Sequence, residues 1–106
     1  MPLPFLIPII LGGLAAAGIT TAIILAILNW SRIVDWFKGR KSLKQQDKDN
    51  IAFTIKQEMA NGNFEVVQGI FNEETEELLD GEKYEAEELD AELAKHHRNG
   101  PLVVYN

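Results

Sequence analysis

The sequence predicts an α+β protein that consists of a single N-terminal transmembrane helix and a small cytoplasmic ββ(β)αβ module. Two observations carry this prediction. Residues 1–28 contain no charged side chain, and a basic segment with two tryptophans follows them. From Ile51 onward the apolar residues recur with the period of two that is typical of β-strands. The predicted division is a transmembrane helix with an interfacial extension at 1–37, a basic linker at 38–50 and the module at 51–106.

The predicted anchor begins near Pro8 and has about 20 residues before Asn29, which is enough to cross a hydrocarbon core. A cleaved signal peptide is disfavoured because no base precedes the apolar core. An interfacial amphipathic helix is disfavoured because the segment has no polar face. A buried helix of a globular domain is disfavoured as well, since 106 residues offer little chain to wrap a helix that is apolar all round.

Bases follow the apolar segment and none precedes it. The positive-inside rule therefore predicts a cytoplasmic (inner) membrane protein of bacterial type, with its N-terminus outside and its module in the cytoplasm. The basic cluster is interpreted as a general topology determinant rather than a specific lipid site. The predicted membrane-interface anchors are Trp30, Arg32, Trp36, Phe37, Lys38, Arg40 and Lys41.

Small residues recur along one face of the predicted anchor. Such a stripe lets two membrane helices approach closely, so it predicts an interface for self-association or for another membrane protein. The residues of this predicted helix–helix interface are Ala15, Gly18, Ala22 and Ala26.

Asn61-Gly62 is a strong hairpin signal in the module. Read as a two-residue type I′ loop, it pairs Ile55 with Gln68 and leaves Val67 and Phe71 on the outer, solvated face. These two residues are predicted as a possible protein contact. Gly69 interrupts the second strand and indicates a bulge or a close backbone approach.

Later elements are read from turn and capping signals. Residues 76–79 begin a third strand, and residues 86–97 read as a helix with acids in its first turns and bases in its last. Asn99-Gly100-Pro101 ends this helix. Residues 102–105 are β-branched and aromatic, and they are expected to return to the sheet.

The sequence contains no signature of catalysis or of cofactor binding. Cysteine is absent, and serine occurs only at Ser31 and Ser42, so the module offers neither a thiol nor a serine triad. The adjacent His96 and His97 diverge around a helix and make poor metal ligands. The glutamates read as a solvated face, and an acidic C-terminal half repels nucleic acid. No catalytic, cofactor-binding or metal site is predicted.

The predicted function is that of a non-enzymatic, membrane-anchored accessory or adaptor protein that acts by protein–protein interaction. Its expected partners are the lipid bilayer and either another membrane protein or a second copy, with no nucleic acid and no small-molecule substrate. The alternative is a small membrane-active effector, a toxin or lysis-type protein whose helix oligomerises in the bilayer. An enzyme that shares a site with a partner ranks third.

Overall fold

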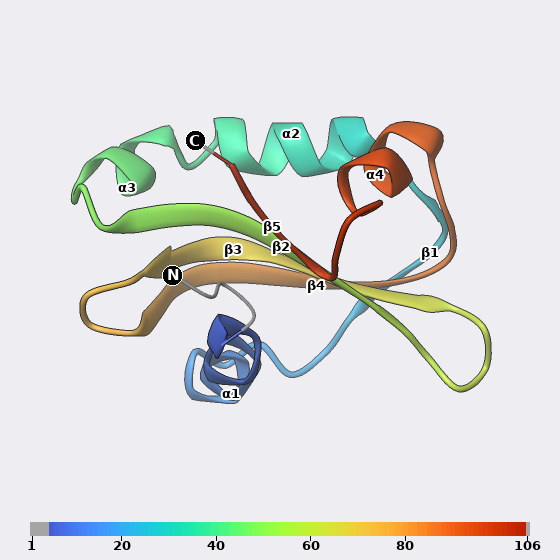
Figure 1. Ribbon diagram of the computed structural model, residues 1–106, viewed down its shortest axis with the longest axis horizontal. Helices are drawn as coiled ribbons and strands as arrows, with labels where there is room; N and C mark the ends of the chain where they lie inside the picture. The colour runs from blue at the N-terminus through green and yellow to red at the C-terminus, as the bar shows by residue number, and fades with distance from the viewer. Residues whose placement is uncertain (1–4, 106) are drawn as a thin grey trace.

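A computed structural model describes residues 5–105 and shows a five-stranded mixed sheet with helices on both faces (Figure 1). The strand order is β1-β4-β3-β2-β5, in which β1 runs parallel to β4 and the other neighbours are antiparallel. Helix α1 lies on one face, whereas α2, α3 and α4 lie on the other. The elements in chain order are α1 (Leu6–Ala16), β1 (Ile23–Leu28), α2 (Trp30–Lys38), α3 (Lys41–Gln45), β2 (Asn50–Glu58), β3 (Phe64–Asn72), β4 (Glu77–Leu89), α4 (Ala91–His96) and β5 (Leu102–Tyr105).

The predicted transmembrane helix is wrong. Within residues 5–105 no helix combines the length and the apolar composition needed to cross a bilayer. Helix α1 has 11 residues and is about 17 Å long, against about 30 Å of hydrocarbon. A turn and a connection follow at 17–22, and the end of the apolar segment forms β1. The predicted single-pass topology and inner-membrane location are overturned with the helix, and the membrane-active effector loses the element on which it depended.

Gly18 ends α1. Its φ is +81°, its N–H donates to the carbonyl of Ala15 at 3.1 Å, and the N–H of Ile19 donates to the carbonyl of Leu14 at 2.9 Å. These two hydrogen bonds around a left-handed glycine form a Schellman motif, which supplies hydrogen-bond donors to the last carbonyl groups of a helix. The glycine that was predicted to face another membrane helix is therefore the stop signal of a short one. The run Ile-Ile-Leu-Ala-Ile-Leu that follows has high β-propensity and adds to the sheet as β1.

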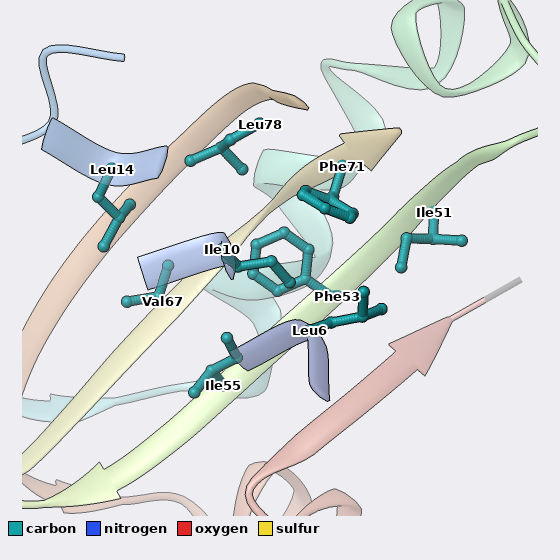
Figure 2. Close-up of a cluster of buried hydrophobic side chains, with 9 residues drawn as sticks. All are labelled: Leu6, Ile10, Leu14, Ile51, Phe53, Ile55, Val67, Phe71 and Leu78. Atoms are coloured by element: carbon teal, nitrogen blue, oxygen red, sulfur yellow. The ribbon is translucent and has the colours of Figure 1, made fainter. Parts of the chain in front are cut away.

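The two faces of helix α1 differ in the size of their side chains rather than in polarity. Leu6, Ile10 and Leu14 recur every four residues and are buried against Phe53, Phe71 and other apolar groups of β2, β3 and β4 (Figure 2). Gly13 lets the helix approach closely, since a Cβ there would lie 3.3 Å from that of Leu78. The outer face carries one proline and three small residues: Pro8, Gly12, Ala15 and Ala16. This distribution explains why the sequence shows no polar face although the helix has only one buried side.

The opposite face of the sheet carries a second apolar cluster. It joins Ile33 of α2 and Leu93 of α4 to the sheet residues Leu28, Val66 and Tyr84. Asp90 positions both helices, because its carboxylate accepts from the N–H of Leu93 and from the N–H of Trp30, each at 2.9 Å. One carboxylate thus caps the first turns of α2 and α4 together.

The hairpin has a loop one residue longer than predicted. Met59 donates its N–H to the carbonyl of Asn63 at 2.8 Å, and Gly62, with φ at +88°, takes the left-handed position. This is a three-residue loop closed by a left-handed glycine, not a type I′ turn. The register therefore shifts by one, so that Ile55 lies opposite Val67 rather than Gln68. A shift of one residue moves a side chain to the other face, and it places Val67 under α1.

The third strand exists but extends far beyond the predicted residues. Strand β4 continues to Leu89, so Ala86 and Leu89 belong to the sheet, and α4 is correspondingly short. Residues 102–105 do return to the sheet as β5, which pairs antiparallel with β2. The linker read at 38–50 contains α3.

Candidate functional site

A groove of about 440 Å³ opens between α2, α3 and the sheet. Helix α2 forms one side of the groove with residues at helical spacing, and strands β2, β3 and β5 form its floor. The apolar lining consists of Trp30, Val34, Phe37, Ala52, Ile70 and Tyr105.

Three lysines, Lys38, Lys41 and Lys44, line the same groove, together with Gln45. No acidic residue is among the described lining residues. The ion pairs present within residues 5–105 are Arg40–Asp80, Lys83–Glu65 and His96–Glu92, none of which uses these three lysines. Like charges close together on an apolar wall create a positive potential that attracts an anion.

An aromatic cluster lines the groove along α2. The ring of Trp30 stacks on His96 with centroids 4.1 Å apart, and it lies 5.5 Å from Tyr105. Phe37 lies 5.8 Å from the same tyrosine. Because Asp90 also holds the backbone N–H of Trp30, the position of this indole is fixed from two sides.

Beneath the aromatic cluster runs a buried chain of hydrogen bonds. His97 is 4% exposed, and its Nδ1 lies 3.2 Å from the carbonyl oxygen of Gly100, which can only accept. Nδ1 therefore carries the proton, and Nε2 accepts from the hydroxyl of Thr54 at 2.7 Å. Thr54 Oγ1 in turn accepts from the hydroxyl of Tyr105 at 2.7 Å. Burial raises the pKa of Tyr105, so this phenol remains a donor.

The imidazole of His97 is held neutral. Burial lowers its pKa, the hydrogen bond to Gly100 opposes that effect, and electrostatic repulsion from Lys56 and from the neighbouring His96 adds to the lowering. With Nδ1 donating to a carbonyl and Nε2 accepting from a buried hydroxyl, we interpret the chain as a structural support that ties α4 and β5 to β2.

We expect the stability of the protein to fall as the pH is lowered through about 6.5, the unfolded-state pKa of histidine. The unfolded chain binds a proton there, whereas folded His97, with its lowered pKa, does not. The free energy of unfolding should therefore decline toward acid by at most about 1.4 kcal/mol per pH unit. Urea unfolding at several pH values measures the slope. His97→Gln should flatten it between neutral pH and the folded pKa, and an unchanged slope would contradict the assignment.

A second buried pair ties α2 to the sheet. The hydroxyl of Tyr84 donates to Gln68 Oε1, and Gln68 Nε2 donates to the carbonyl of Ile33 at 3.1 Å. Burial, helped by Glu82, raises the pKa of Tyr84 to about 12. The phenol is therefore protonated at any physiological pH, and it serves as a permanent donor inside the core.

Strand β1 forms a second distinct surface, at one edge of the sheet. Within residues 5–105 its only strand neighbour is β4. Ile24 is 70% exposed and Ile27 is 49% exposed, and no residue of the strand is charged. Exposed edge strands usually carry charge, proline or a bulge that prevents pairing with another chain.

The residues of the predicted helix–helix interface do not share one face. Ala15 lies on the exposed side of α1, Gly18 forms the turn after it, Ala22 lies in the connection to β1, and Ala26 is exposed on β1. The predicted contact residues Val67 and Phe71 are 1% and 0% exposed beneath α1, so neither is at the surface.

The predicted membrane anchors lie in helix α2, in the turn after it and at the first residue of α3, and most of them contact protein. Trp30 and Phe37 line the groove, and Trp36 packs against Phe37 and beneath the guanidinium of Arg40. Arg40 also pairs with Asp80 at 2.7 Å. Arg32 is exposed, and Lys38 and Lys41 lie at the groove.

Sequence reasoning missed the groove and the β1 edge, although one signal for the groove was present. Trp30, Val34 and Phe37 recur at helical spacing with charged residues between them. This pattern is typical of a helix at a membrane interface and also of a helix that packs on a sheet. Within residues 5–105 no group of histidine and acidic side chains is arranged to hold a metal ion.

Comparisons with protein families, with curated proteins and with solved structures find no significant match to this chain.

Proposed function

We propose that this protein acts by protein–protein interaction rather than by catalysis, and that the edge of β1, which pairs with no second strand within residues 5–105, joins it to a second copy of itself. The observation that carries the proposal is the exposed, uncharged edge strand. An edge strand offers a row of unpaired N–H and C=O groups to any extended chain of matching character. The dimer would act as an adaptor.

A second copy is the occupant whose chemistry fits best. The sequence of β1 is apolar throughout, so an antiparallel copy across a two-fold axis brings no charge into the contact. The sheet order continues through β1 of each copy into one larger sheet. The groove is floored by β2, β3 and β5, so pairing at β1 leaves its floor outside the contact.

The polar groups described above support a non-catalytic role. The buried hydroxyls and imidazole satisfy one another, since within residues 5–105 no buried side-chain nitrogen or oxygen lacks a hydrogen-bond partner. Thr54 is 0% exposed, and its hydroxyl is bonded on both sides. No activated nucleophile faces solvent among these groups.

We expect the purified protein to form dimers in sedimentation velocity as its concentration rises, and the double substitution Ile24→Lys with Ile27→Lys to abolish them. Four lysines along one edge would repel, which should raise the dimer dissociation constant by about 100-fold or more. Both positions are exposed, so the monomer should keep its fold, which circular dichroism checks.

The matched control is Gln57→Lys, which adds a charge at an exposed strand position on β2, away from β1. It should dimerise like the parent protein. The absence of native cysteine allows a second measurement, in which Ala26→Cys is cross-linked between copies by a short bismaleimide while Gln57→Cys is not. A protein that stays monomeric at all concentrations, or dimers that survive both lysines, would overturn the proposal.

A further inference from the structure

The groove between α2, α3 and the sheet has two chemically different ends. Helix α2 begins beside α4 and runs toward α3 (Figure 1). Trp30, at its first residue, contributes the aromatic end, whereas Lys38, Lys41 and Lys44 follow in the direction of α3. An elongated ligand that fits this groove therefore has an apolar body and an anionic head.

The lysines are not accounted for by helix capping alone. Lys38 and Lys44 lie in the last turns of α2 and α3, where a cation stabilises the helix end. Lys41 is the first residue of α3, where the helix dipole disfavours a positive charge. All three nevertheless line one groove that has no acidic residue among its described lining.

The size of the groove helps to decide whether its anionic occupant is a small molecule or an acidic protein segment. Its volume of about 440 Å³ falls within the range of small-molecule sites, which are mostly apolar with a few polar groups that orient the ligand. The floor residues Ala52 and Ile70 are buried sheet positions, so the apolar surface is preformed. These features favour a small molecule over an acidic protein segment.

We propose that this groove binds a small amphipathic monoanion, with an aromatic or aliphatic body against Trp30, Phe37 and Tyr105 and a carboxylate at the three lysines. The apolar lining supplies affinity through burial. The lysines supply selectivity for the anion and its direction in the groove. This site is independent of the β1 edge, so it can be tested in the monomeric variant as well.

The test is a titration of the isotopically labelled full chain with 4-phenylbutyrate, followed by two-dimensional NMR. We expect saturable shifts of the Trp30 indole and of Val34 and Ala52, with no comparable shifts at Ile24 or Ile27. The neutral analogue 4-phenylbutan-1-ol should bind about tenfold more weakly because it lacks the charge. Acetate, which lacks the apolar body, should produce no saturable shift at these residues.

Two variants and one control separate the roles of the lysines and of the apolar lining. Lys38→Gln with Lys41→Gln and Lys44→Gln should weaken binding of 4-phenylbutyrate about tenfold and remove the preference over the alcohol. Lys48→Gln with Lys95→Gln removes exposed lysines that do not line the groove, and it should change nothing. Val34→Trp should fill the groove and reduce binding of both compounds.

Three results would overturn the proposal. The first is equal binding of the acid and the alcohol, and the second is unchanged binding after loss of the three lysines. The third is an acidic peptide, such as heptaglutamate carrying one tryptophan, that shifts the groove residues when 4-phenylbutyrate does not. That outcome would assign the groove to a protein segment instead.

Discussion

Ile10→Asp is expected to unfold the protein at neutral pH. Ile10 is 0% exposed at the centre of the cluster that joins α1 to β2, β3 and β4 (Figure 2). A carboxylate there has no described basic partner in the cluster, and burying an unpaired charge costs several kcal/mol even after relaxation. The whole free energy of folding for a domain of this size is about 5–15 kcal/mol.

The measurement is urea unfolding followed by circular dichroism, with two companions to Ile10→Asp. Ala15→Asp places the same charge on the exposed side of the same helix, and it should lower the free energy of unfolding by only about 1 kcal/mol, because a carboxylate in the last turn opposes the helix dipole. Ile10→Ala removes only apolar contacts, and it should lower the free energy of unfolding by about 2–4 kcal/mol. If Ile10→Asp and Ala15→Asp behaved alike, α1 would not be part of the core.

Gly69→Ala is the second substitution with a large expected effect. Gly69 lies in the middle of β3, opposite Phe53 on β2 and Gly81 on β4. An added Cβ would lie 2.5 Å from the carbonyl oxygen of Asp80 and 3.0 Å from the ring of Phe53. The backbone on one side and a fully buried ring on the other leave little room for relaxation, so we expect a loss of about 2–4 kcal/mol.

Gly12→Ala is the matched control for this prediction. Gly12 lies on the outer face of α1, and a Cβ there meets no atom within 4 Å. Alanine is favoured over glycine inside a helix, so this change should stabilise the protein by up to about 1 kcal/mol. Urea unfolding of the two variants should therefore give shifts of opposite sign. A destabilisation of similar size in both would mean that the close approach at Gly69 does not matter.

Local signals in the sequence were read with mixed success. Asn61-Gly62 does mark the hairpin, and Gly69 does mark a close backbone approach, because both features depend on a few neighbouring residues. The register of the same hairpin was wrong, since Gly62 can close either of two loops that differ by one residue. Burial on both faces of the sheet decides between them, and that information is not local.

Gly18 illustrates the same limit within the N-terminal segment. A glycine in an apolar run is equally consistent with a close contact between membrane helices and with a helix end. Gly18 is left-handed because the chain turns there and places Ile19 against the apolar cluster under α1. This contact with distant residues cannot be read from the local sequence. The spacing of Trp30, Val34 and Phe37 indicates one wall of the groove, but not its floor, because Tyr105 is brought against Trp30 from a distant part of the chain.

The sequence by itself determined the hairpin at Asn61-Gly62, the return of residues 102–105 to the sheet, the absence of cysteine, and the presence of an uncharged N-terminal segment. Those properties rest on residue types and on hydrogen bonds between near neighbours. Only the tertiary structure decided that this segment becomes α1 and β1, that Val67 and Phe71 are buried, and that three lysines share a groove with three aromatic rings. The physical reason is that lipid and a protein core satisfy an apolar chain equally well. The choice between them depends on distant residues, here the uncovered faces and edge of a sheet formed later in the chain.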